Sequence, residues 1–225
     1  MTQPRILTFN FHEPYLCLMA KTGLDMDVGG YEEGSLARSW QQFHRELPPN
    51  LRLLDEKAWR EKAAAGYYDV IIAHNEMNAV NVHDAPAARL LICHNRRSFL
   101  NTTVNAPKGN PVEEFDRMLE FLSQRFSFVF ISESKREDYG LPGRVILPGI
   151  DLEEWGGYTG EKASVLRVGN TMPERNLMFD VDFQEAVLRG IPNRVVGLNP
   201  TIPDAAPAPS FAAMQACYRE HRCLL

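Results

Sequence analysis

Three histidines stand directly after apolar runs of the chain, and their side chains are the ones best suited to chemistry. These are His12, His74 and His94, and the second and third are followed at once by Asn75 and Asn95. An imidazole can give or take a proton near neutral pH. If the apolar runs are parallel strands, their carboxyl ends meet at one edge of a sheet, where open α/β sheets bind ligands. The pattern predicts a site at that edge, with a hydrogen-bonded structural role for each histidine as the alternative.

Metal or disulfide chemistry is not favoured by the spacing of the potential ligands. The sequence has no H-x-x-x-H, no Cys/His pair at ligand spacing and no carboxylate cluster to match. The four cysteines, Cys17, Cys93, Cys217 and Cys223, are scattered and form no C-x-x-C. We therefore expect reduced thiols and a cytoplasmic protein, either free or peripheral to a membrane.

Short apolar runs rich in β-branched and aromatic residues alternate with helical patterns over the first two thirds of the chain. The runs are Arg5–Phe11, Leu24–Val28, Leu51–Leu54, Tyr68–His74, Arg89–His94, Phe126–Ile131 and Val145–Leu147. A loop containing His83 and Asp84 precedes the fifth run. This alternation predicts an α/β fold with a mostly parallel, doubly wound sheet.

Helix starts can be placed from capping residues. Pro14 suits the first turn of a helix that begins after His12, and Asp55 can cap a helix that runs to Ala65. Asn110 and Pro111 suit the cap and first position of another helix. Ser134 and Glu137 have the spacing of a capping box.

Pro148–Asp151 forms a turn that neither a helix nor a central strand accommodates, so it predicts a hinge between two units. Beyond it we expect strands at Val165–Gly169 and Arg194–Leu198, a helix at Leu177–Arg189 with Phe179, Phe183 and Val187 on one side, and a helix from Ser210 to about His221. Cys223–Leu225 resembles the start of another strand. The second unit is therefore expected to be incomplete.

Composition excludes several classes of function. A formal net charge of −5 argues against a nucleic-acid-binding surface, which is normally basic. No apolar run reaches the length of a transmembrane helix. Asn10–Glu13 stands where a dinucleotide-binding protein would carry G-x-G-x-x-G, which removes most support for a dehydrogenase.

Several segments together resemble GT-B glycosyltransferases of the retaining, family-4-like group. Val145–Asp151, V-I-L-P-G-I-D, is similar to the crossover between the two domains of that family. Leu90–Asn95 and Tyr68–Asn75 resemble two strands that end in histidines at its reaction centre. Leu166–Arg175 is similar to its V-G-R-x-x-x-x-K donor segment, with Gly169 at the glycine, Asn170 in place of the arginine and Arg175 in place of the lysine.

The resemblance implies a GT-B fold, with a complete acceptor-side Rossmann-like domain over residues 1–150 and an incomplete nucleotide-sugar-binding domain over residues 151–225. It implies metal-independent transfer of a sugar from a nucleotide diphosphate sugar to a carbohydrate or other hydroxyl acceptor, with no further cofactor. His94 would be catalytic. Gly169, Asn170 and Arg175 would bind the donor phosphates, while His12, His74, Asn75 and Asn95 would line the acceptor side.

The acidic E-x7-E element of that family lies beyond the matched segments, so we expect this chain to be a fragment without transferase activity of its own. Two alternatives stay open. One is a sugar-nucleotide epimerase built on the same fold. The other is a non-catalytic α/β module that binds a sugar or a protein.

Overall fold

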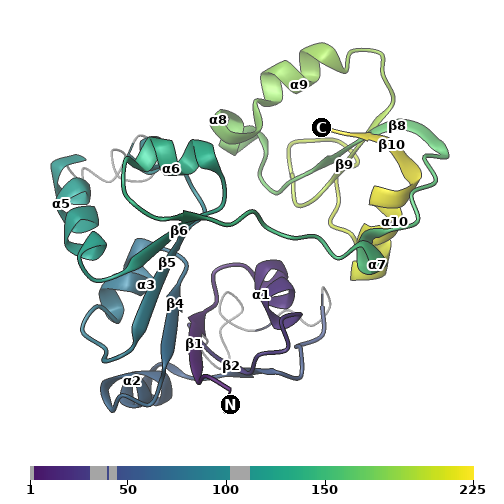
Figure 1. Cartoon of the computed structure of the whole chain (residues 1–225). Helices are drawn as coiled ribbons and strands as arrows, with labels where there is room; N and C mark the ends of the chain where they lie inside the picture. Colours follow the sequence, from purple (N-terminus) through teal and green to yellow (C-terminus); the bar gives the residue numbers. More distant parts are fainter. Residues whose placement is uncertain (1–2, 31–39, 41–44, 102–111) are drawn as a thin grey trace. The chain divides into compact units, whose positions relative to one another are not determined.

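The computed structural model describes residues 3–30, 40, 45–101 and 112–225, and it divides into two compact units (Figure 1). The first unit contains the described residues up to Trp40 and from Leu47 to Gly149. The second contains Arg45, Glu46 and Ile150–Leu225. The expected helix start at Asn110 and Pro111 lies outside the described residues.

The first unit is built on seven parallel strands. They are β1 (Ile6–Phe9), β2 (Met26–Gly29), β3 (Leu51–Leu53), β4 (Val70–Ala73), β5 (Ala88–Cys93), β6 (Ser127–Phe130) and β7 (Arg144–Val145). Their order is β3-β2-β1-β4-β5-β6-β7, and every neighbouring pair is parallel. This is the strand order of a Rossmann-like sheet: strands β2 and β3 are added on one side of β1, and strands β4 to β7 are added on the other side. The predicted parallel α/β sheet is confirmed.

Helices cover both faces of this sheet, because alternate strand residues point to opposite sides. The helices are α1 (Glu13–Ala20), α2 (Glu56–Ala64), α3 (Glu76–Asn81), α4 (Arg97–Phe99), α5 (Val112–Ser123) and α6 (Glu133–Tyr139). On one face α1 packs against Ile6 and Met26. On the other, residues of α2, α3 and α5 pack against Leu7 and Leu91. The sheet is thus the middle layer of three.

The start of α6 differs from the prediction. Ser132, not Ser134, is the N-cap, and its hydroxyl accepts a hydrogen bond from the Lys135 amide at 3.3 Å. Strand β6 ends at Phe130, so the chain turns into the helix two residues earlier than the capping-box spacing suggests. The helix ends at Gly140, which adopts the left-handed conformation at φ 65°.

The second unit contains a separate, three-stranded parallel sheet. Its strands are β8 (Lys162–Val168), β9 (Asn193–Val196) and β10 (His221–Leu224), in the order β10-β8-β9. The helical segments are α7 (Leu152–Trp155), the 3-10 helix η3 (Pro173–Arg175), α8 (Asn176–Phe179), α9 (Val181–Val187) and α10 (Phe211–Glu220). Ser210 caps α10 as predicted, with its hydroxyl accepting from the Ala213 amide.

The prediction of a single helix over Leu177–Arg189 is wrong. Asp180 adopts the left-handed conformation at φ 48°, which divides the segment into α8 and α9. The expected apolar side is also wrong, because Phe183 and Val187 are 54% and 42% exposed. The break rotates α9 so that it buries Val181 and Gln184 instead.

Candidate functional site

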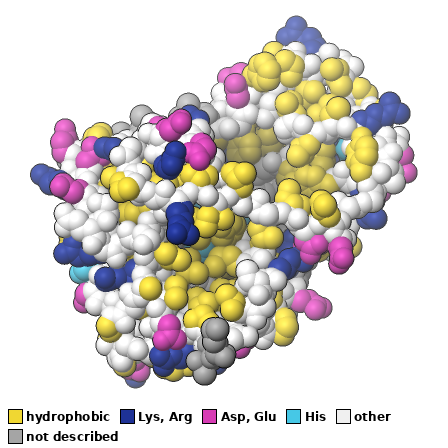
Figure 2. Space-filling model, in the orientation of Figure 1, with side chains coloured by type: hydrophobic (Ala, Val, Ile, Leu, Met, Phe, Trp, Pro, Cys, Tyr) yellow, Lys and Arg dark blue, Asp and Glu magenta, His cyan; other side chains and the backbone are white. Residues whose placement is uncertain are grey.

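The reversal of strand order places the predicted histidines at one edge of the first sheet. His12 lies three residues beyond β1, and His74 and His94 immediately follow β4 and β5. These are the carboxyl ends of adjacent parallel strands, beside the point between β1 and β4 where the order of the strands reverses. Ligands of open α/β sheets bind at such a point. Figure 2 shows histidine surface only in small, separate areas of the visible face, where hydrophobic side chains cover much more of the surface.

His74 and His94 are in direct contact. Nδ1 of His74 lies 3.0 Å from Nε2 of His94, within hydrogen-bond distance. On the inner side, Nε2 of His74 lies 2.8 Å from the hydroxyl of Thr8 in β1, and both of these residues are buried. The structure thus contains a chain of two hydrogen bonds that joins Thr8, His74 and His94.

The register of the strands explains this alignment. Thr8 pairs with Ile72 across β1 and β4, and Ile72 pairs with Leu90 across β4 and β5. His74 follows Ile72 by two residues, and His94 follows Leu90 by four. All three side chains of the hydrogen-bond chain therefore fall on the face of the sheet that α1 covers.

Two aromatic rings, one from the β1–α1 connection and one from the first turn of α1, enclose the histidine pair. Phe11 stacks on His94 with ring centroids 4.8 Å apart, and Tyr15 meets the same imidazole edge-on at 4.8 Å. Tyr15 also contacts His74 at 5.6 Å. Phe11 is 41% exposed, so its ring offers apolar surface beside His94.

This environment keeps both imidazoles neutral at neutral pH. Burial, with the neighbouring His94, lowers the pKa of His74 to about 3. Burial, with the positive charges of His12 and Lys135 nearby, lowers the pKa of His94 to about 4. Partial burial also lowers the pKa of His12. The pair is therefore a neutral hydrogen-bonding group.

A second polar cluster lies at the same edge and was not predicted. The hydroxyl of Tyr139 in α6 donates to Glu76, the first residue of α3, at 3.2 Å. Burial raises the pKa of the Glu76 carboxyl. Burial, with Glu76 nearby, raises the pKa of Cys93 to about 12, so this thiol stays protonated. The sequence carried one signal for this cluster, since Glu76 closely follows His74 along the chain.

The two asparagines differ from the histidines in their surroundings. Asn75 is the N-cap of α3, and its side-chain oxygen accepts from the Asn78 amide at 2.8 Å. Asn95 lies on the bend between β5 and α4. The structure thus gives Asn75 a defined local role in starting a helix, next to the histidine pair.

The donor-segment residues lie in the second unit, where β8 and β9 end. Gly169 follows β8 with no room for a side chain, because a Cβ there would lie 2.7 Å from the Phe179 ring. The Asn170 side chain accepts from the Leu198 amide at 2.8 Å. Arg175 contacts the sulfur of Met178 at 3.1 Å and the Phe179 ring at 5.1 Å. Gly169 and Asn170 thus lie in the loop after β8, and Arg175 ends the short helix η3 that follows.

Hydrogen bonds hold that loop region rigid. Asn199 donates from its side chain to the Gly169 carbonyl at 2.7 Å and accepts from the Met172 amide at 2.7 Å. The Thr171 amide donates to the Leu198 carbonyl at 2.8 Å. Asn199 is therefore a further residue that shapes this loop pair.

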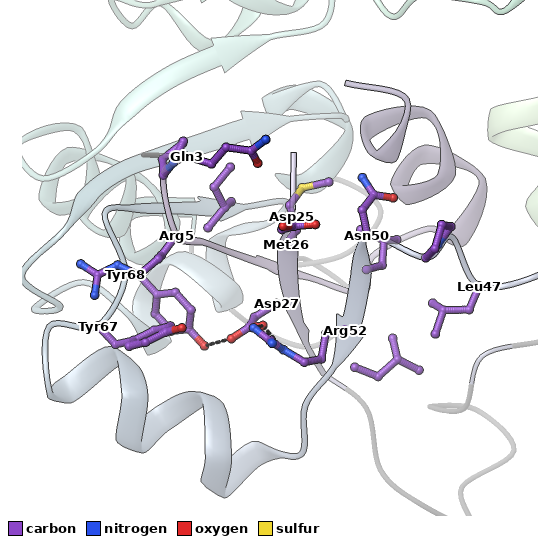
Figure 3. A pocket seen from close by; sticks show the side chains of 15 residues that line it. Gln3, Arg5, Asp25, Met26, Asp27, Leu47, Asn50, Arg52, Tyr67 and Tyr68 are labelled. Atoms are coloured by element: carbon purple, nitrogen blue, oxygen red, sulfur yellow. Dashed lines mark hydrogen bonds and ion pairs between the residues drawn. The ribbon is translucent and has the colours of Figure 1, made fainter. Parts of the chain in front are cut away.

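A hollow of about 780 Å³ lies at the opposite edge of the first unit's sheet from the histidines (Figure 3). It is lined by residues at the amino ends of β1, β2 and β3. Its buried carboxylate, Asp27, accepts from Tyr68 and Lys62 at 2.9 Å each and forms an ion pair with Arg52. Because these polar groups satisfy one another, we interpret the cluster as structural.

Within the described part of the chain, no group of three or more His, Cys, Asp or Glu side chains is arranged to hold a metal ion. No helix in the same residues has the length and apolar character needed to cross a bilayer. The fold and site together define a Rossmann-like α/β protein with a neutral histidine pair at the sheet's switch point. Neither a comparison with protein-family models nor one with curated proteins finds a match for this chain.

Proposed function

We propose that the chain is a glycosyltransferase of the GT-B type, which moves a sugar from a nucleotide diphosphate sugar to an acceptor hydroxyl with retention of configuration and without a metal. The observation that carries the proposal is the His74–His94 pair at the carboxyl edge of β4 and β5. In the glycosyltransferases that the sequence resembles, a histidine at the end of such a strand lines the reaction centre.

In this proposal the first unit binds the transferred sugar and its acceptor. His94 orients the sugar or assists proton movement at the acceptor hydroxyl. The exposed face of Phe11 offers an apolar surface to a sugar ring beside that imidazole. Lys135, close enough to influence the pKa of His94, adds positive charge where an anionic donor would lie.

The second unit would bind the nucleotide diphosphate of the donor. The loops after β8 and β9 are joined by a hydrogen bond, and both follow parallel strands. Nucleotides bind at such strand ends in α/β sheets. Arg175 would contribute charge for the diphosphate after leaving its contacts with Met178 and Phe179.

One observation favours a non-catalytic, sugar-binding module as the second candidate. Asn170 stands where the family carries an arginine, and its side-chain oxygen already holds the Leu198 amide. The segment therefore supplies one phosphate-binding cation, Arg175, where the family supplies two. Binding of sugar nucleotides without turnover would identify this alternative.

The test is to titrate the chain with UDP-, GDP- and ADP-sugars, following backbone amide NMR signals, and to assay transfer and release of free sugar. We expect saturable shifts at Gly169–Thr171 and at His94. With turnover, His94→Ala should lower kcat by about a hundredfold at unchanged melting temperature. The matched control is His83→Ala, at a histidine that packs on Phe121 away from the site. A free epimer as product would indicate the epimerase.

The absence of binding for all three nucleotide classes at millimolar concentration would contradict the proposal. A His94→Ala variant that loses folding but keeps its activity per folded molecule would return His94 to a structural role.

A further inference from the structure

The hydrogen-bond chain from Thr8 through His74 to His94 has one closed end and one open end. Thr8 is fully buried in β1, and its hydroxyl has a single hydrogen-bond partner, Nε2 of His74, among the residues that the structure describes. At the outer end, Nε2 of His94 is used by His74, and Nδ1 of His94 has no partner in the described chain. This Nδ1 atom is therefore the one that can meet a ligand.

We propose that Thr8 and His74 hold His94 in the tautomer that carries its proton on Nδ1, so that His94 binds a substrate oxygen as a hydrogen-bond donor. The inference rests on the proposed function for the identity of that substrate. Thr8 and His74 are positioning residues, because they act only through His94.

Only two arrangements of protons satisfy both hydrogen bonds with neutral rings. In the first, the Thr8 hydroxyl donates to Nε2 of His74, Nδ1–H of His74 donates to Nε2 of His94, and His94 carries its proton on Nδ1. In the second, every donor and acceptor is exchanged, and Nδ1 of His94 is a bare acceptor. The choice at Thr8 therefore decides whether His94 donates or accepts at its outer atom.

The hydroxyl of Thr8 favours the first arrangement of protons. In the second, the hydroxyl of Thr8 would accept from His74, and its own O–H would need another acceptor. The described residues supply none within hydrogen-bond distance. A buried donor left without an acceptor is costly enough to bias an equilibrium by about tenfold or more.

The groups around His94 agree with a donor role. Burial lowers the pKa of His94, and the charge of Lys135 in α6, together with that of His12 when it is protonated, lowers it further. Phe11 and Tyr15 cover its ring with apolar surface, and His74 faces it from β4. These neighbours disfavour a cationic imidazole, which a general base must become. They favour a ligand atom that is an electron-rich oxygen, from a sugar hydroxyl or a phosphate.

The tautomers can be measured directly in long-range ¹H–¹⁵N NMR spectra of the histidine rings at about pH 7. We expect Nδ1–H for both His74 and His94 in the unmodified chain. Thr8→Val keeps the shape of the side chain but removes the donor, so the two tautomers should approach equal populations. Thr8→Ser, the matched control, keeps the hydroxyl and should keep the Nδ1–H form.

A His94 signal with its proton on Nε2, or a Thr8→Val spectrum with unchanged tautomers, would overturn the proposal. The unmodified chain decides the tautomer even where Thr8→Val fails to fold.

The ligand is tested by adding inorganic phosphate in one sample and glucose in another while the Nδ1–H proton of His94 is observed. A shift with phosphate alone identifies a phosphate oxygen, and a shift with glucose alone identifies a sugar hydroxyl. A shift with neither overturns the donor role. These readouts need no turnover, so the inference can hold where transfer of sugar from nucleotide sugars is not found.

Discussion

Acidification should destabilise the first unit through the His74–His94 pair. The pKa of His74 is about 3 in the folded chain and 6.5 for an ordinary histidine. Below about pH 6.5 this imidazole therefore binds a proton in the unfolded chain and stays neutral in the folded chain. Because the pKa is lowered on folding, the free energy of unfolding is fully present above pH 6.5 and falls as the pH decreases towards 3.

The size of this loss in the free energy of unfolding follows from the pH range between the folded and unfolded pKa values. Each pH unit within it removes about 1.4 kcal/mol for one such group, so about two units, from pH 6.5 to pH 4.5, remove about 2.7 kcal/mol through His74. His94, with a folded pKa of about 4, adds to the loss, although its partial exposure and its contact with His74 reduce that addition. We expect the pair to account for about 3–5 kcal/mol in total.

The assay is urea denaturation at several pH values between about 7 and 4.5, in a Trp155→Phe background. Trp155 belongs to the second unit, so the fluorescence of Trp40 and Trp59 then reports on the first. The comparison is with His74→Gln, which cannot titrate but keeps polar atoms beside Thr8. The stability of the variant should fall by about 2–3 kcal/mol less over this range. Parallel pH profiles for the two proteins would refute the assignment of the lowered pKa to His74.

Two further predictions concern stability. Asp27→Asn removes a carboxylate that is 2% exposed, so it should lower the free energy of unfolding in urea by about 2–4 kcal/mol. Asp25→Asn, at an exposed residue, should lower it by under about 0.5 kcal/mol. Equal losses for the two variants would contradict the structural role of Asp27. Gly197→Ala should destabilise the second unit by about 2–4 kcal/mol, as measured by Trp155 fluorescence. The reason is that φ at Gly197 is 138° and that a Cβ would lie 2.0 Å from the Gly169 carbonyl oxygen. Gly190→Ala, at φ 76° with open space around it, should cost only about 1 kcal/mol, and a cost as large as that of Gly197→Ala would contradict the steric argument.

Much of the first unit could be predicted because its strands are short, apolar and β-branched. The positions of β1, β4 and β5 followed from such runs, and the cap of α2 at Asp55 followed from its side chain. Helices of four to seven residues were harder, since α3 and α7 are too short to show a helical period. The break at Asp180 depends on one residue in an unusual backbone conformation, for which the sequence gives little signal.

The position of His74 and His94 at one edge of the sheet could be predicted, but the contacts between them could not. Placing His74 and His94 at one edge required only that their strands be parallel. Their hydrogen bond depends on β4 being the neighbour of β5, and the bond to Thr8 on β1 being the neighbour of β4. Strand order is a long-range property, so a local pattern did not reveal that Thr8 contacts His74.

The histidine pair also argues for a role beyond stability. Two asparagine or glutamine side chains could make equivalent neutral hydrogen bonds with Thr8, and they would not titrate. Imidazoles at these positions instead make the first unit less stable in acid, because burial disfavours their charged forms. An imidazole adds a rigid ring in which the hydrogen bond of the inner nitrogen determines whether the outer nitrogen carries a proton. The orientation of His94 by Thr8 through His74, which we propose, would serve a ligand that meets a defined atom of His94.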